Sequence, residues 1–320
     1  MIEIFSSTPL CTVQDFGRLE ARKYGVGSAG AMDQLALSVA NIMLNNPENS
    51  ACIEVPVYPF SVKFHQNCDF SITGPEGEFD LDNQVFPTWW AYSAKAGQIL
   101  TIHRPVNGGR AYLALGGGID VPIVMGSRST QLRGEFGGFE GRMLARGDQL
   151  SAVKPVGQRR LNFGVVAPQN ALQLGEGNVT TVRTIRASEY MGFPPKEQEK
   201  FWNSCWKVTP QSNRYGYRLE GEPIKPTQPI ETLSHGIVPG VIQIPPNGQP
   251  IIQLRDAQPT GGYPKFGTVI EADLWRLGQA AIGGKIRFRD VTYEQACQAS
   301  EENSAYLKEV KRMVNLVEGF

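Results

Sequence analysis

The chain has 320 residues, and its 31 Lys and Arg residues balance its 31 Asp and Glu residues. This balance excludes the basic excess of proteins that bind nucleic acid or anionic membranes, and it favours a small ligand or a protein partner. Five widely spaced cysteines without a Cys-x-x-Cys pair argue against a disulfide framework and a zinc site, so we expect no bound metal. The chain shows neither a signal-peptide pattern nor an apolar run of about twenty residues, which predicts a soluble, cytoplasmic protein.

Short β-rich runs separated by turn residues dominate the chain. Each run is bounded by Gly, Pro, Asn or Asp, as expected of strands joined by turns. Many short strands at this spacing favour a barrel or a sandwich, so the predicted fold class is mainly β with few helices. The clearest strands are expected at residues 2–6, 60–64, 98–104, 110–115 and 285–291.

Three helices are expected among these strands. From Met32 to Leu44 apolar residues recur at helical spacing, and Asn45-Asn46-Pro47 ends the helix. A short helix is expected to begin at Pro194-Pro195, because proline is favoured in a first helical turn. Thr292 and Gln295 form a capping-box pattern, and the apolar face that follows predicts a docked helical tail.

The domain organisation is predicted from length and composition. A chain of this size exceeds the length at which one hydrophobic core usually stops growing, so we expect two domains. A polar, turn-rich stretch near residues 165–180 marks the boundary between them. The predicted parts are a β domain at residues 1–170, a second β domain at 171–291 and the helical tail at 292–320.

Two segments with arginines are candidates for binding an anion. Arg128 stands between Ser127 and Ser129, and its planar fork suits a carboxylate or phosphate, although a buried structural arginine is an equal alternative. Arg214 and Arg218 would share one face of an extended strand, where they would meet an anion together or form a solvated edge. Neither segment is a Walker loop, because the Gly-Lys-Ser/Thr ending is missing.

The segment from His235 to Leu274 has the composition of a pocket rim. Gly and Pro separate short β-rich runs, while Asp256, Gln258 and Tyr263 supply a carboxylate, an amide and a phenol. These groups suit proton transfer and hydrogen bonding to an amide-like substrate, with Asp256 and Gln258 on one face if the segment is extended. The alternative is a turn in which Asp256 accepts backbone N–H groups.

Seven segments in this order resemble the signature segments of the biotin-dependent carboxyltransferase family: TVQDFGR, GAMD, GGGIDVP, MGSRST, SNRYGYRLEG, PGVIQIPPNGQP and DAQPTGGYP. The resemblance extends from residue 1 to about residue 290 and implies two cyclophilin-like β-barrel domains. Asn213, Ala257 and Pro259 depart from the residues common in the family, which puts a catalytic role for position 213 in doubt.

The resemblance is strongest to the 5-oxoprolinase branch of the family. It implies a C subunit that works with the sister 5-oxoprolinase subunits A and B to open 5-oxo-L-proline to L-glutamate with ATP. ATP is expected to be bound by the complex rather than by this chain alone, and no covalently attached biotin is expected. We predict Asp256, Gln258 and Tyr263 as catalytic residues, and Ser127, Arg128, Ser129, Arg214, Gln243, Gly261 and Gly262 as substrate-binding residues.

We hypothesise separate roles for these residues. Arg128 or Arg214 would hold the substrate carboxylate or phosphoryl oxygens, and Asp256 would orient water or the ring N–H. Gln258 and Tyr263 would form hydrogen bonds with the lactam amide. Two alternatives are a carboxyltransferase component that accepts a carboxyl group from a separate biotin carrier, and a non-catalytic regulatory protein that binds a kinase-inhibitor-like partner.

Overall fold

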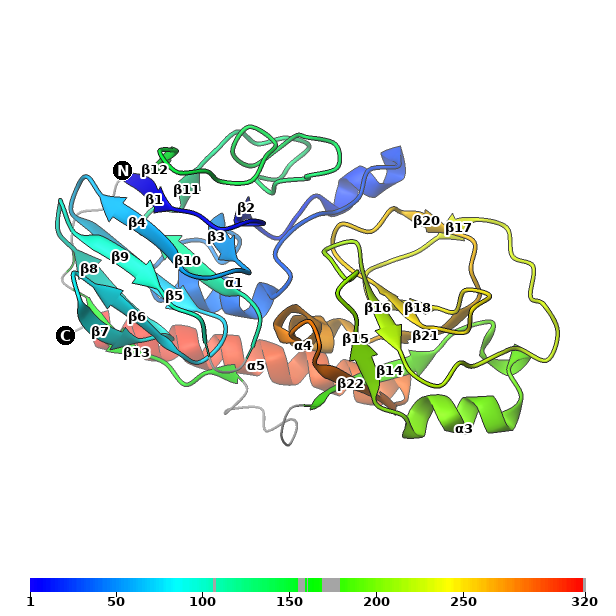
Figure 1. Cartoon of the computed structure of the whole chain (residues 1–320). Helices are drawn as coiled ribbons and strands as arrows, with labels where there is room; N and C mark the ends of the chain where they lie inside the picture. Colours follow the sequence, from blue (N-terminus) through cyan, green and yellow to red (C-terminus); the bar gives the residue numbers. More distant parts are fainter. Residues whose placement is uncertain (106–107, 155–158, 160, 169–178, 319–320) are drawn as a thin grey trace. The chain divides into compact units, whose positions relative to one another are not determined.

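The computed structural model describes residues 1–105, 108–154, 159, 161–168 and 179–318 (Figure 1). The chain divides into two compact units, which we call the first unit and the second unit. The first comprises Met1–Arg18, Ala29–Leu172 and Ser304–Phe320, and the second comprises Leu19–Ser28 and Gln173–Asn303. The predicted domain boundary between residues 170 and 171 lies outside the described residues.

Two antiparallel sheets form the first unit within the described part of the chain. One has the strand order β11-β12-β1-β4-β9-β6-β7, and the other has the order β13-β8-β5-β10-β3-β2. The strands are β1 (Ile2–Ser6), β2 (Thr12–Gln14), β3 (Cys52–Val55), β4 (Phe60–Phe64), β5 (Cys68–Thr73), β6 (Glu78–Leu81), β7 (Gln84–Pro87), β8 (Trp90–Ala94), β9 (Ile99–Ile102), β10 (Ala111–Leu115), β11 (Ile119–Asp120), β12 (Gln149–Ala152) and β13 (Asn162–Gly164).

Side-chain alternation explains the core of the first unit. On β4 the alternate residues Phe60, Val62 and Phe64 are fully buried, while Lys63 between them is partly exposed. Successive side chains of a strand point to opposite faces, so one face of β4 joins the hydrophobic core. The predicted strands at 2–6, 60–64, 98–104 and 110–115 are confirmed as β1, β4, β9 and β10.

Helix α1 (Gln34–Ile42) covers the second of these sheets at β5 and β10. Its first turn is capped by Asp33, whose Oδ1 accepts a hydrogen bond of 2.8 Å from the backbone N–H of Ala36. Such a side-chain cap satisfies one of the N–H groups that lack a partner at a helix start. The predicted helix between Met32 and Leu44 is therefore confirmed, and Asp33 accounts for the position of its start.

A closed barrel forms the second unit (Figure 1). Its strand order is β14-β21-β18-β19-β16-β15-β22, and the parallel pairing of β14 with β22 closes it. A separate pair of short strands, β17 with β20, also belongs to this unit. The strands are β14 (Val179–Arg186), β15 (Trp206–Val208), β16 (Gly216–Glu220), β17 (His235–Gly236), β18 (Val241–Gln243), β19 (Ile251–Gln253), β20 (Thr260–Gly261), β21 (Lys265–Val269) and β22 (Lys285–Asp290).

The helices of the second unit pack on the barrel or extend from it. Buried Phe201 of α3 (Pro195–Asn203) stacks on Phe288 of β22 with ring centroids 4.6 Å apart. The other elements are η1 (Leu19–Tyr24), η2 (Tyr190–Gly192), η3 (Glu271–Asp273) and α4 (Leu274–Gln279). The predicted strand at 285–291 and the helix predicted to begin at Pro194-Pro195 are confirmed as β22 and α3.

The C-terminal helix α5 (Tyr293–Glu318) begins with the predicted capping box. The backbone N–H of Thr292 donates to Gln295 Oε1 at 3.0 Å, and the N–H of Gln295 donates to Thr292 Oγ1 at 3.3 Å. Val310 and Val314 of α5 are buried in the hydrophobic cluster of the first unit that also contains residues of α1. The mainly β fold class with few helices and a C-terminal helix is confirmed. Among the described residues, no helix combines the length and the apolar character needed to span a membrane.

Candidate functional site

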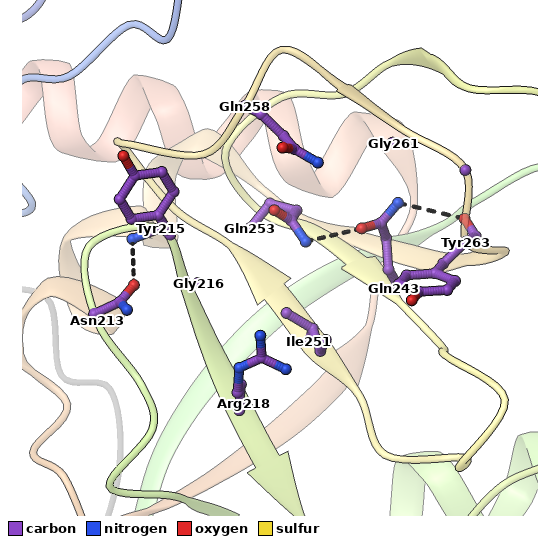
Figure 2. A pocket seen from close by; sticks show the side chains of 11 residues that line it. Asn213, Tyr215, Gly216, Arg218, Gln243, Ile251, Gln253, Gln258, Gly261 and Tyr263 are labelled. Carbon is purple, nitrogen blue, oxygen red and sulfur yellow. Dashed lines mark hydrogen bonds between the residues drawn. The ribbon is translucent and has the colours of Figure 1, made fainter. Parts of the chain in front are cut away.

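A cavity of about 540 Å³ opens on one side of the barrel in the second unit (Figure 2). Its lining is mostly neutral and polar, with three glutamine carboxamides and two tyrosine rings among the lining groups. Strands β16, β18, β19 and β20 and the turns beside them supply these groups. The lining residues are Asn213, Tyr215, Gly216, Arg218, Gln243, Ile251, Gln253, Gln258, Gly261, Gly262 and Tyr263.

Strand register places the β16 and β19 residues on the same face. Gly216 pairs with Gln253 and Arg218 pairs with Ile251, while Tyr217 between them is buried. Because side chains alternate along a strand, Arg218, Ile251 and Gln253 project from the face opposite to that of Tyr217. Gly216 brings no side chain to this face, so the space opposite Gln253 stays open.

A chain of hydrogen bonds orients the carboxamides of two glutamines (Figure 2). Gln243 Nε2 donates to the backbone carbonyl of Tyr263 at 3.4 Å, and Gln253 Nε2 donates to Gln243 Oε1 at 2.8 Å. A carbonyl only accepts, so the Gln243 atom that faces Tyr263 must be its nitrogen. Gln243 then presents its oxygen to Gln253, and Gln253 must donate to it. The remaining polar atom of the Gln253 carboxamide, Oε1, is a hydrogen-bond acceptor at the cavity.

Gly261 gives Gln243 the room that this arrangement needs. A Cβ atom at position 261 would lie 2.6 Å from Gln243 Nε2, which is closer than real Cβ contacts allow. The adjacent strand β17 pairs with β20 through His235 opposite Gly261. The two glycines of the Gly261-Gly262 segment line the cavity beside Tyr263, a residue that is 47% exposed.

Arg214 and Asp256 are both buried and bind each other. Arg214 Nε and Nη2 lie 3.0 Å from Asp256 Oδ2 and Oδ1, and the Asp256 N–H donates to the Arg214 carbonyl at 2.9 Å. Neither residue lines the cavity. Both carboxylate oxygens of Asp256 accept from Arg214. This pairing is consistent with a role for Asp256 in positioning the backbone, whereas the sequence predicted a catalytic role for it.

Two expectations about extended backbone are wrong. Strand β16 begins at Gly216, so Arg214 precedes it, and the buried Arg214 does not share a face with the exposed Arg218. Strand β19 ends at Gln253, and Asp256 lies in a turn in which it is 3% exposed while Gln258 is exposed. The Asp256 carboxylate binds Arg214, whereas Gln258 lines the cavity.

The predicted Ser127–Ser129 segment belongs to the first unit and surrounds a buried carboxylate. Asp15 Oδ1 accepts from Ser127 Oγ at 2.6 Å and from Ser129 Oγ at 2.5 Å, and its Oδ2 accepts from the Arg128 N–H at 2.6 Å. The Arg128 guanidinium donates to the Val121 carbonyl and lies 3.2 Å from Asp120. These contacts hold the loop to the segment that contains Asp15.

Glu189 supports the strand that follows Tyr263. Its Oε2 accepts from the Lys265 N–H at 2.9 Å, and the Lys265 ammonium lies 3.9 Å away. Burial alone would raise the pKa of Glu189, but the bonds from Ser188 and Lys265 and the charges of Lys265 and His235 lower it on balance. Glu189 therefore contributes to folding as a carboxylate.

The structure brings five predicted residues together at the cavity and adds others. Gln258, Tyr263, Gln243, Gly261 and Gly262 line it, whereas Arg214 and Asp256 lie beside it as a pair. Gln253 was not among the predicted site residues, and Arg218 was considered only together with Arg214, as a pair that would bind an anion or form a solvated edge. Period-two alternation in Ile252-Gln253-Leu254, where Gln253 stands between two apolar residues that the structure buries, is the signal that predicts an outward Gln253. Only the pairing of β16 with β19 shows that Arg218 lies on the same face.

The comparison with known protein families identifies the class to which this fold belongs. The family model of the carboxyltransferase domain, subdomains A and B, matches residues 24–290, which is most of the chain. The chain belongs to this carboxyltransferase-domain family.

Several known proteins are similar to this chain along nearly its whole length. The chain is 41% identical over 310 residues to the C subunit of 5-oxoprolinase from Escherichia coli, covering 97% of each chain. It is 40% identical to the C subunit of 5-oxoprolinase from Haemophilus influenzae, covering 98% of this chain and 99% of the relative. The solved structure of the K. lactis urea amidolyase matches with a TM-score of 0.88 and 28% identity, over 97% of this chain and 20% of that protein.

Proposed function

We propose that the chain is a component of an ATP-dependent 5-oxoprolinase, which opens 5-oxo-L-proline to L-glutamate together with two sister subunits. The observation that carries this proposal is the cavity, which is lined by carboxamide and phenol groups that match a lactam amide. Full-length similarity to proteins named as the C subunit of 5-oxoprolinase supports the same conclusion.

The lactam has one N–H donor and one carbonyl acceptor, and the cavity offers a partner for each. Gln253 Oε1 would accept from the ring N–H, because the Gln253 nitrogen is already bound to Gln243. Gln258 and the Tyr263 hydroxyl would donate to the ring carbonyl oxygen. In this proposal Asp256 and Arg214 hold the backbone on which Gln258 is placed, and Gly261 and Gly262 leave room for the ring.

Ring opening breaks the bond between the carbonyl carbon and the ring nitrogen. Water supplies the oxygen that joins the carbonyl carbon, and the nitrogen gains a proton, which gives the amine and the new carboxylate of glutamate. The stability of a five-membered lactam accounts for the coupling to ATP, which takes up a second water and is converted to ADP and phosphate as the ring opens.

We propose that ATP is bound by the complex and not by this cavity alone. A triphosphate needs several cationic groups or a cradle of backbone N–H groups, whereas the described lining residues include one arginine. The sequence also lacks the Gly-Lys-Ser/Thr ending of a phosphate-binding loop. The present residues do not fit a nucleotide, so we assign them no step in phosphoryl transfer.

The test is glutamate release from 5-oxo-L-proline by the reconstituted complex, with and without this chain and with and without ATP. We expect release only when the chain, both sister subunits and ATP are present. Release at the same rate without the chain would remove the proposal.

A carboxyltransferase reaction is the second candidate. The family model and the fold similarity to urea amidolyase, with a TM-score of 0.88, favour it. In that reaction the bond between the ureido nitrogen of biotin and its carboxyl group breaks, and the carboxyl group bonds to a nitrogen of the acceptor. The acceptor nitrogen loses a proton, and the ureido nitrogen of biotin gains one. Transfer of labelled carboxyl from a carboxylated biotin carrier to urea would support this candidate, and its absence alongside glutamate release would exclude it.

A further inference from the structure

We propose that Arg218 binds the carboxylate of the lactam substrate and so selects anionic cyclic amides over neutral ones. This inference rests on the proposed function and specifies how the same cavity recognises its substrate. It assigns to Arg218 the role first considered for Arg128 or Arg214, because the Arg214 guanidinium binds Asp256 and the Arg128 guanidinium binds Val121 and Asp120.

The charge of the cavity supports an anionic ligand. Among the described residues that line it, Arg218 is the one with a charged side chain. Other cations of the second unit already face carboxylates, among them Arg214 with Asp256, Arg255 with Glu271 and Lys265 with Glu189. A lone guanidinium among neutral carboxamides gives the lining a net positive charge, and its planar fork suits a carboxylate.

The donors of Arg218 remain available in the described part of the chain. Its backbone is held in place, since its N–H donates to Ser212 Oγ at 2.9 Å and its carbonyl accepts from the same hydroxyl at 3.2 Å. Its exposed side chain forms no ion pair with any described residue. The strand therefore fixes where the side chain starts and leaves the guanidinium free to meet a ligand.

The order of groups along the cavity matches the order of groups in the substrate. In 5-oxoproline the ring N–H lies between the ring carbonyl and the carbon that carries the carboxylate. In Figure 2 Gln258 and Arg218 lie on opposite sides of the lining, and Gln253 lies between them. A ligand whose N–H binds Gln253 thus presents its carbonyl toward Gln258 and its carboxylate toward Arg218.

The register of β16 with β19 allows one ligand to contact both Gln253 and Arg218. Arg218 pairs with Ile251, so Gln253 is its diagonal neighbour on the same face. Diagonal neighbours of an antiparallel pair are about 7–8 Å apart, a gap that a small ring carrying a carboxylate spans when the long arginine side chain extends toward it. Gly216, directly opposite Gln253, adds no side chain to the intervening space, which Ile251 lines beside Arg218.

The experiment compares two ligands that differ only in the carboxylate. The reconstituted complex is assayed with 5-oxo-L-proline as substrate and with 2-pyrrolidinone, the same lactam without the carboxylate, as a competitive inhibitor. The variants are Arg218→Ala and Arg218→Lys. Arg289→Ala serves as the matched control, because Arg289 is an exposed strand arginine of the same barrel outside the cavity lining.

We expect Arg218→Ala to raise the KM for 5-oxo-L-proline by about 10- to 100-fold, the range for a charge-assisted hydrogen bond. The Ki of 2-pyrrolidinone should stay the same, and Arg218→Lys should recover part of the lost affinity. An unchanged KM would overturn the inference and leave the proposed function standing, as would an equal rise in KM and Ki. Absence of ATP-dependent glutamate release by the wild-type complex would instead overturn the proposed function and this inference with it.

Discussion

Arg214 and Asp256, which are 42 residues apart in the sequence, bind each other through two contacts of 3.0 Å between a buried guanidinium and a buried carboxylate. The pair joins the segment before β16 to the turn after β19, and a backbone hydrogen bond of 2.9 Å between the same residues reinforces it. Asn213 and Gln258 lie within two residues of the pair and line the cavity. The geometry of the cavity therefore depends on an ion pair that is not part of its surface.

Substituting Asp256 with Ala should destabilise the second unit by about 3–5 kcal/mol, because the buried Arg214 would lose its counter-charge. Denaturant unfolding of the chain measures this effect. Asp120→Ala is the control, since Asp120 is the exposed partner of Arg128 and such pairs contribute about 0–1 kcal/mol. Loss of activity with unchanged stability would show that Asp256 acts catalytically, as the sequence predicted.

Substituting Gln253 with Met should raise the KM for the lactam about 3- to 10-fold, because the acceptor for the ring N–H is lost. Steady-state kinetics of the reconstituted complex measures it. Gln249→Met is the matched control: Gln249 belongs to the same unit and binds the backbone of Gly221 outside the cavity. Equal KM values for the Gln253→Met and wild-type chains would remove Gln253 from substrate recognition.

Substituting Gly261 with Ala should lower activity with little change in stability. The new Cβ would lie 2.6 Å from Gln243 Nε2, and the flexible end of Gln243 would move and break its bonds to Tyr263 and Gln253. Gly236→Ala tests the same pair of short strands where a Cβ meets nothing within 4 Å. Comparable kcat/KM values for these two variants would contradict the arrangement, and thermal unfolding checks that both variants are folded.

The lowered pKa of Glu189 predicts a pH-dependent contribution to stability. Burial opposes ionisation of this side chain, but the bonds from Ser188 and Lys265 outweigh it. Its stabilisation is complete above the unfolded-state pKa of about 4.3 and is lost as the pH falls through the lower, folded-state value.

Denaturant unfolding of wild type and Glu189→Gln from pH 7 down to pH 2.5 measures this contribution. The stability difference between the two proteins should stay constant at neutral pH and shrink below about pH 4. A difference that does not vary over this range would show that Glu189 stabilises β21 without its charge.

Local patterns predicted the local elements of this fold. The helix that Asp33 caps, the capping box at Thr292 and the alternation along β4 each depend on residues close in sequence. The cavity depends instead on which strands pair. The position of Gly216 opposite Gln253 follows from the register of β16 with β19, which no short stretch of sequence specifies.

Arg214 and Arg218 show the same limit of prediction from local sequence for single residues. Arg214 and Arg218 have the even spacing of one strand face, but the strand begins between them at Gly216. The pairing of Arg214 with Asp256 across 42 residues decides that one arginine is buried and leaves the other for the cavity. Strand propensity and residue spacing predict local structure, whereas the burial of Arg214 depends on Asp256, which is distant in the sequence.

The parallel pairing of β14 with β22 has a consequence for the order of events during synthesis. The barrel closes between its first strand, which begins at Val179, and its last strand, which ends at Asp290. A ribosome adding about 5–20 residues per second must therefore complete more than a hundred residues after Val179 before closure is possible. Until then, the edges of β14 and β15 that pair with β22 remain unpaired. The second unit is therefore most vulnerable to aggregation and proteolysis just before β22 is synthesised.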